Sequence, residues 1–364
     1  MASNFDLAAL AVAGCCPGNE ILYDDLGLPS IMVKIPKMTY AQLGMGESTA
    51  VHPAFIVNGQ EIDELYISKY LNVINNNRAY SLGGARPKHS INFDNARIAC
   101  ENKGEGWHIM TRMEWGMLVR WCQNNGVMPK GNNNYGKHNT ESVYKAIPDN
   151  KDETHYAYRT LTGTGPLTWY HDQTPSGIAD LCGNVWEWSG GIRTVKGELQ
   201  ILNNNNGADA SNSQGVDSLD WKAIKASDGT LIEPDGSGTT SGSVKMDWIN
   251  SKLTYSTSKT NDTGSGDNLY SSCTFANIVC DGTISDAAKL LLADLGLYMY
   301  GGNTELFSGQ LCYFDNVSDE RFFCSGGTYY ATSYGLASFG ANNARSDSRA
   351  GIGFRSAYCK LPAV

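Results

Sequence analysis

The sequence contains no cluster of basic residues. Its 364 residues include 28 Lys and Arg against 37 Asp and Glu, which gives a formal net charge of -9 at pH 7. Nucleic acids and anionic membranes are bound by concentrated positive charge, which displaces counterions from phosphate. No apolar run reaches the length of a transmembrane helix either. We therefore expect no nucleic-acid partner and no membrane insertion.

The ten cysteines are few for a disulfide scaffold of this size, and their spacing is irregular. The ten cysteines include no C-x-x-C pair and no zinc-ligand spacing. They are therefore expected to be mainly small core residues, and no metal site is predicted. Cys324 and Cys359 bracket the last segment of the chain, and in an oxidising compartment they could form a disulfide.

Residues 325–358 lack lysine, glutamate, glutamine, methionine and tryptophan altogether. The usage of the whole chain predicts about five such residues in a segment of this length. The segment is instead rich in Tyr, Ser, Asn and Gly. In antibody-like binding loops, tyrosine supplies rigid contact area and small polar side chains supply adaptable hydrogen bonds. The composition indicates a binding surface, and a Gly- and Ser-rich loop of chance composition is the alternative.

The N-terminal residues include a short apolar run, "LAALAVAGCC", from Leu7 to Cys16. Val12 to Cys15 match the positions of a lipoprotein cleavage site, but a secretory signal has a positively charged leader, and the only charge before this run is Asp6. We expect residues 1–29 to form an N-terminal arm or docking segment that packs against a partner.

Local patterns predict a hairpin and two helices in the first third of the chain. Asn58 and Gly59 separate two β-prone runs, and both residue types accept the positive φ of a type I′ turn. Asn92 can cap an amphipathic helix that follows it. Thr111 and Glu114 form a capping box at the start of another helix.

The later part of the chain is predicted to be mainly β-structure. Residues 185–188 alternate as in a strand, which places Trp186 and Trp188 on one face and Glu187 on the other, where a buried carboxylate requires a partner. Residues 195–320 are rich in Gly, Ser, Thr and Asn, and one helix is predicted after Ser285.

Three separated blocks resemble one known family. "GIADLCGNVWEWSGG" (177–191), "CSGGTYY" (324–330) and "GIGFRSAYC" (351–359) are similar to the signature blocks of the C-type lectin fold of the formylglycine-generating-enzyme (sulfatase-modifying-factor) type. Upstream, "YISKYLNV" and "PKHSINFDNARIACENKGEGWHIMTRMEW" match the same family in the same order. The resemblance implies an α+β lectin-like domain over residues 30–364 with a large β-rich insertion at 195–320.

Within this family, the chain most resembles the variable proteins of diversity-generating retroelements. The enzymes of the family use two cysteines a few residues after the "GG-S/T-Y" block, and those positions fall near Ala331 and Leu336, which carry no thiol. In the variable proteins, adenines are randomised, chiefly in Asn codons that end in a pyrimidine. That process produces fifteen residue types and never the five that residues 325–358 lack. The resemblance therefore implies a binding protein and not an enzyme, with a variable region at about 325–358.

The resemblance and the composition together define a candidate site. Ligand-contacting residues are expected among the variable positions, which are Thr328, Tyr330, Ala331, Thr332, Ser333, Tyr334, Ala341, Asn342, Asn343, Asp347, Arg349 and Gly351. The rigid frame beneath them is expected to include Trp186, Glu187, Trp188, Gly326, Gly327, Arg345, Gly353, Phe354 and Arg355. We expect either Arg355 or Arg345 to pair with Glu187.

The resemblance implies a receptor-binding protein of a phage tail, located in the virion. Its partners would be a protein or glycan of the host surface, other phage tail proteins and sister chains in a homotrimer. A surface adhesin of a bacterial cell is the alternative within the same family, and a structural virion decoration is another. No cofactor is expected.

Two further alternatives concern chemistry. A divergent enzyme of the formylglycine-generating type would use His108, His155 or His171 with carboxylates, although the histidines have no ligand spacing. A calcium-dependent lectin would hold structural Ca²⁺ in an acidic loop such as residues 313–320.

Overall fold

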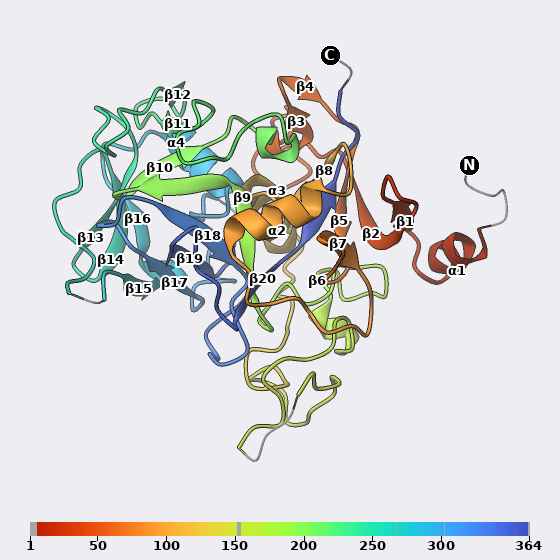
Figure 1. Cartoon of the computed structure of the whole chain (residues 1–364). Coiled ribbons are helices and arrows are strands. Elements are labelled where there is room, and N and C mark those ends of the chain that lie inside the picture. Colours follow the sequence, from red (N-terminus) through yellow and green to blue (C-terminus); the bar gives the residue numbers. More distant parts are fainter. Residues whose placement is uncertain (1–5, 151–153, 267, 302, 363–364) are drawn as a thin grey trace.

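The computed structural model describes residues 6–150, 154–266, 268–301 and 303–362. They form a mixed α+β structure with several sheets (Figure 1). The α-helices in these ranges are α1 (Leu7–Cys15), α2 (Phe93–Glu101), α3 (Arg112–Asn124) and α4 (Asp286–Asp294). The predicted starts of α2, α3 and α4 are confirmed, because Asn92, Thr111 and Ser285 each accept a hydrogen bond from a backbone amide of the first turn.

One sheet has five strands and joins strands from the first third of the chain to a strand near its C-terminal end. Its order is β1, β2, β5, β21, β8, and every neighbouring pair is antiparallel. The strands are β1 (Asn19–Tyr23), β2 (Pro29–Pro36), β5 (Glu64–Ser68), β8 (Trp107–Ile109) and β21 (Ser356–Tyr358). The last strand of the chain thus lies between two strands from its first third, so the C-terminal segment is anchored at its end.

A second sheet has twelve strands and carries the candidate site. Its main path runs β15, β17, β19, β18, β9, β10, β13, β14, β16, while β11 and β12 extend β10 and β20 pairs with β9. Three of its strands come from the C-terminal region: β18 (Arg321–Ser325), β19 (Phe339–Asn343) and β20 (Ile352–Phe354). The others are β9 (Trp186–Val195), β10 (Glu198–Ile201), β11 (Lys222–Ile224), β12 (Leu231–Ile232), β13 (Lys245–Ile249), β14 (Lys252–Ser256), β15 (Ser271–Thr274), β16 (Ile278–Cys280) and β17 (Leu311–Phe314).

Two small hairpins complete the strands of the described residues. The predicted hairpin at Asn58 and Gly59 is confirmed: it joins β3 (Ile56–Val57) to β4 (Gln60–Glu61), and these two turn residues have φ angles of 51° and 76°. The other hairpin pairs β6 (Asn72–Asn75) with β7 (Arg78–Ser81).

The predicted two faces of the strand at 185–188 are also confirmed. Trp186 and Trp188 belong to one buried cluster beneath α2, together with Phe93 and Phe322. Glu187 is buried outside that cluster. A larger cluster fills the space between α3 and the two sheets, where the Trp115 indole donates a hydrogen bond to the Leu336 carbonyl.

The Cys324–Cys359 disulfide is absent from the structure. Both cysteines are buried and unpaired, and they lie in different hydrophobic clusters. Burial raises the pKa of Cys324 above its ordinary value, so the residue remains a thiol and packs as a small core side chain.

The expected N-terminal arm, residues 1–29, includes a strand of the five-stranded sheet. Within it, β1 pairs with β2 along its whole length, and Pro17 and Gly18 line a cavity of the body. Among the described residues of the arm, α1 lies away from the body (Figure 1). None of the side chains of α1 is buried, and Leu7 is 75% exposed. In the described part of the chain, no helix is both long and apolar enough to span a membrane.

Candidate functional site

A buried ion pair joins β9 to Arg355, the residue between β20 and β21. The Arg355 guanidinium donates two hydrogen bonds of 2.9 Å to the Glu187 carboxylate, and two more to the carbonyl oxygens of Ser68 and Ala179. Both charged side chains are almost completely buried. The prediction that an arginine pairs with Glu187 is confirmed, and the partner is Arg355.

Arg345 makes a different connection. It pairs with Glu320 at 3.1 Å and with Asp94 at 2.8 Å, and its guanidinium lies 4.5 Å from the centre of the Phe322 ring. Arg345 therefore ties residues 325–358 to α2 and to Glu320, just before β18.

Two glycines bring residues 325–358 close to the core. Gly326 and Gly327 have φ angles of 85° and 86°, in the left-handed region that glycine favours. A Cβ on Gly327 would lie 2.2 Å from the Cβ of Tyr334, and one on Gly326 would lie 2.6 Å from the Leu181 carbonyl oxygen. At these two positions the frame has no room for a side chain.

Six of the twelve predicted ligand-contacting residues line one open cavity of about 370 Å³. We call this cavity the tyrosine pocket. It is lined by Trp186, Tyr270, Tyr313, Tyr330, Tyr334, Asn342, Asn343, Arg349, Gly351 and Ile352. Three elements of the C-terminal region meet there: the loop after β18, the end of β19, and the loop before β20.

The aromatic rings of the tyrosine pocket contact one another in a row. Ring centres are 5.7 Å apart for Tyr270 and Tyr313, 6.1 Å for Tyr313 and Tyr334, and 6.2 Å for Tyr334 and Tyr330. Trp186 packs on Tyr334 at 4.9 Å. Burial raises the pKa of the Tyr330 and Tyr334 phenols, so these hydroxyls remain protonated and can both donate and accept hydrogen bonds.

The other six predicted contact residues lie elsewhere. Thr328 and Ala341 are fully buried, so the prediction that they contact ligand is wrong; these small side chains fill the frame beneath the surface. Asp347 accepts hydrogen bonds from the Ala344 amide and from Arg349. Ala331 packs against the Trp186 cluster, whereas Thr332 and Ser333 are exposed and line a neighbouring groove.

Sequence reasoning did not find two residues of the tyrosine pocket, Tyr270 and Tyr313. Both lie within residues 195–320. Tyr313 reaches the pocket because β17 pairs in parallel with β19, and Tyr270 precedes β15, which pairs with β17. No local signal in the sequence marks these pairings, since they join segments that are far apart in the chain.

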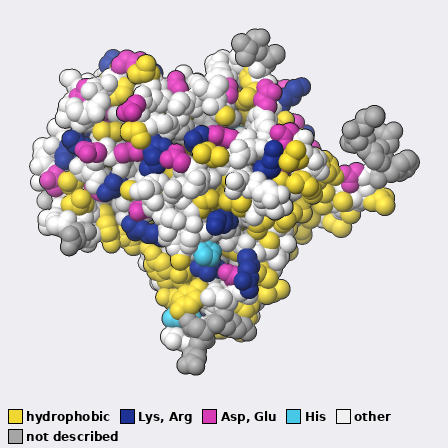
Figure 2. Space-filling model, viewed as in Figure 1, with side chains coloured by type: hydrophobic (Ala, Val, Ile, Leu, Met, Phe, Trp, Pro, Cys, Tyr) yellow, Lys and Arg dark blue, Asp and Glu magenta, His cyan; other side chains and the backbone are white. Residues whose placement is uncertain are grey.

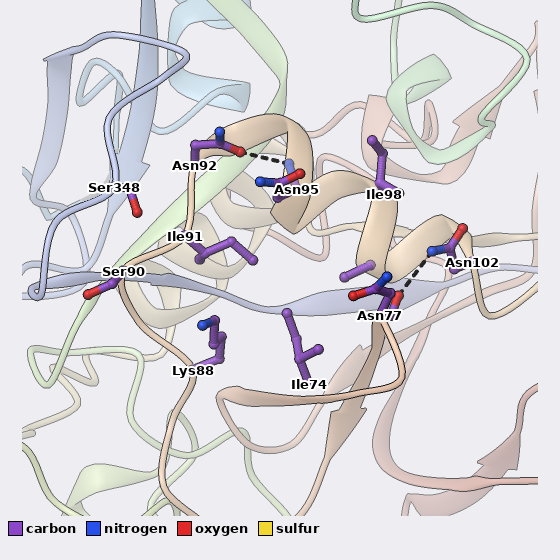
Figure 3. A pocket seen from close by; sticks show the side chains of 11 residues that line it. Ile74, Asn77, Lys88, Ser90, Ile91, Asn92, Asn95, Ile98, Asn102 and Ser348 are labelled. Atoms are coloured by element: carbon purple, nitrogen blue, oxygen red, sulfur yellow. Dashed lines mark hydrogen bonds between the residues drawn. The ribbon is translucent and has the colours of Figure 1, made fainter.

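A second cavity of about 380 Å³ lies beside α2, and we call it the asparagine groove (Figure 3). Asn77, Asn92, Asn95 and Asn102 surround it over a floor that includes Ile74 and Ile91. Two of these amides serve the fold, because Asn92 caps α2 and Asn102 donates to the Asn77 carbonyl. Ser348 also lines this groove, while its neighbour Arg349 lines the tyrosine pocket. The chain at these two residues therefore lies between the two cavities.

The groove beside Thr332 and Ser333 contains a buried thiol and a buried imidazole. Burial raises the pKa of Cys182 to about 12, and it lowers the pKa of His138 to about 4. At neutral pH the cysteine is therefore a thiol, which is a poor nucleophile. The positions that the family resemblance assigns to enzyme cysteines, near Ala331 and Leu336, lie next to this groove along the chain, and Leu336 is in the core.

The three histidines considered for an enzyme lie in different surroundings. His108 contacts the Glu114 carboxylate at 2.8 Å in the core. His171 accepts a hydrogen bond from the Ile178 amide, and His155 stacks on Tyr135. Among the residues that the structure describes, no group of three His, Cys, Asp or Glu side chains could hold a metal ion. In the loop at 313–320, both carboxylate oxygens of Asp315 accept hydrogen bonds from the protein.

Charges of both signs are interspersed on the face that Figure 2 shows.

No family model matches the chain, and the search of curated proteins returns no match.

Proposed function

We propose that this chain is a ligand-binding protein that displays a hypervariable C-terminal surface, as the variable proteins of diversity-generating retroelements do. The proposed scaffold is a C-type lectin fold of the formylglycine-generating-enzyme type with an enlarged insertion. The observation that carries the proposal is the tyrosine pocket, where six predicted variable residues converge on one open cavity.

The contrast between surface and frame supports this function. Tyr330 is 51% exposed, and the Arg349 side chain is 61% exposed. In contrast, Glu187, Arg355 and Trp188 of the expected frame are buried, and the side chain of each is hydrogen-bonded. Binding loops that are already ordered lose less free energy on association than loops that order during binding. A rigid frame with exchangeable surface residues is therefore suited to recognise many ligands with one fold.

We further propose that the protein acts at the tip of a phage tail, in the virion, and binds a protein or glycan of the host surface. An adhesin of a bacterial cell surface is the alternative location. The unburied apolar helix α1 supports a docking role for the N-terminal segment, toward other phage tail proteins or toward sister chains of a homotrimer.

Cell binding tests the proposal with the full chain. Fluorescently labelled protein is applied to a panel of gut bacterial strains and measured by flow cytometry. The triple variant Tyr330→Ala, Asn342→Ala, Arg349→Ala is expected to lose binding to every strain that the wild-type chain binds. The matched control, Tyr144→Ala, Asn75→Ala, Lys252→Ala, removes the same kinds of exposed side chain outside the pocket and is expected to bind normally. Equal binding by the two variants would contradict the proposal.

A further inference from the structure

The tyrosine pocket has one wall outside the predicted variable region. Tyr270 and Tyr313 come from the insertion, and Trp186 comes from the central strand β9. The remaining lining residues come from residues 325–358, and of these Tyr334 and Asn343 are themselves buried; they are Tyr330, Tyr334, Asn342, Asn343, Arg349, Gly351 and Ile352. We call the first group the fixed wall. If the surface changes from copy to copy as proposed, the fixed wall remains and gives every copy the same aromatic contact area.

The fixed wall is held in place by backbone pairing and by ring contacts. Tyr313 lies opposite Gly340 in the parallel pair of β17 and β19, and Gly340 is two residues before Asn342 in the chain. The Tyr270 ring meets the Tyr313 ring at an angle of 69°, and the Tyr270 side chain is 41% exposed. A ring that is supported on one side and exposed on the other can pack against a ligand.

The polar groups of the pocket limit what that ligand can be. Asn342 and Asn343 each carry an amide that can donate and accept, and the tyrosine hydroxyls have the same double capacity. Arg349 is the one charged side chain among the lining residues, and no carboxylate lines the pocket. Arg349 is paired with Asp347, whose Oδ2 lies 3.1 Å from the guanidinium, so its positive charge is balanced. A purely apolar side chain would bury the amides and hydroxyls without partners, which is unfavourable.

We infer that Tyr270 and Tyr313, two residues of the fixed wall, contact the ligand directly, and that the tyrosine pocket accepts one ring of a saccharide. A sugar ring has a C–H face that packs on aromatic rings, and its hydroxyls both donate and accept hydrogen bonds. This matches aromatic rings beside paired amides. The inference rests on the proposed function for the site itself, and it adds the ligand class and two contact residues.

Saturation-transfer NMR with a panel of methyl glycosides, of neutral, N-acetylated and uronic hexoses, tests the inference on the full chain. At least one glycoside is expected to bind. Tyr270→Ala should weaken its binding about fivefold or more, because a ring contact is lost. Tyr270→Phe keeps the ring and should bind within about twofold of wild type. Tyr144→Ala is the control, since Tyr144 is 44% exposed, stacks on one other tyrosine and does not line the pocket.

The outcomes separate this inference from the proposed function. If no glycoside binds while the triple variant at Tyr330, Asn342 and Arg349 still abolishes cell binding, the saccharide inference is overturned and the proposed function stands. If a glycoside binds but responds to Asn95→Ala in the asparagine groove and not to Tyr270→Ala, the site is misplaced and the inference is overturned. A thermal melt of each variant distinguishes lost contacts from lost folding, and Tyr270→Leu provides a second truncation of the ring.

Discussion

The hydroxyl groups of Tyr313 and Tyr334 lie 3.1 Å apart and are hydrogen-bonded. This bond joins residues 195–320 to residues 325–358 through two side chains that line the tyrosine pocket. It gives the two parts of the chain a shared polar contact in addition to the pairing of β17 with β19.

Removing either hydroxyl should cost the same stability. Tyr313→Phe and Tyr334→Phe are each expected to lower the free energy of unfolding by about 1 kcal/mol, because a partly buried hydrogen bond is lost. The double variant should cost little more than either single one, since only one bond is removed. Urea unfolding of the four proteins measures this cycle. Additive losses would show that the two hydroxyls are not partners.

The Glu187–Arg355 pair should be essential to the frame. Glu187→Gln and Arg355→Met each leave a buried charge or polar group without its partner, and each is expected to cost about 3–5 kcal/mol in unfolding free energy. The double variant should recover part of that loss, because it leaves no unpaired charge. Arg349→Met, at an exposed arginine of the same segment, is the control and should change stability by less than about 0.5 kcal/mol. Equal effects at Arg355 and Arg349 would contradict the assignment of Arg355 to the frame.

Glycine at position 327 should be required for packing as well as for backbone conformation. Gly327→Ala places a methyl group against the Tyr334 side chain, so it should lower the unfolding free energy by more than Gly18→Ala does. Gly18 has a similar φ of 83° and open space around it, so its substitution measures the backbone cost alone. The expected difference is about 1–3 kcal/mol, the usual range for overpacking. A difference near zero would mean that the Tyr334 loop moves freely away from the frame.

His171 should make the fold sensitive to acid. Burial lowers its pKa to about 4, against an ordinary value of 6.5, and the nearby Asp172 opposes this shift while Arg355 adds to it. The neutral imidazole is therefore favoured by folding. Its stabilisation is complete above about pH 6.5 and is lost as the pH falls toward 4, by about 3 kcal/mol in total.

The test is the difference in unfolding free energy between wild type and His171→Asn at several pH values. Asparagine can accept the Ile178 amide hydrogen bond but does not titrate, so the wild type should lose its advantage between pH 6.5 and 4. Asp180, whose pKa burial raises to about 6, has the opposite pH dependence between pH 6 and 4, and its effect cancels in the difference. A difference that does not change with pH would show that His171 is not buried in its neutral form.

Local features of the sequence predicted local structure well. The capping residues Asn92, Thr111 and Ser285 mark helix starts because a side chain bonds to amides three residues away or fewer. The Asn58–Gly59 turn was predictable because both residue types accept a positive φ. The partner of Glu187 could be narrowed to two arginines, but choosing between them required the pairing of β20 with β9, which places residues 352–354 beside residues 186–188.

Most contacts between distant segments could not be predicted. Nothing near Tyr270 or Tyr313 indicates that the insertion strands join β19. The burial of Thr328 and Ala341 could not be predicted either, because their small side chains suit both a surface and a tightly packed frame. The sequence of β1 has no alternating pattern that distinguishes a strand from an extended arm, so β1 and its pairing with β2 were not predicted.

The most direct test of the central claim is to sequence copies of this gene from many sister genomes. The account predicts that substitutions concentrate at the pocket positions Tyr330, Asn342, Asn343 and Arg349, at codons where adenines are replaced, while Glu187, Arg355 and the fixed wall stay constant. Variation spread evenly along the chain, or absent from residues 325–358, would contradict it.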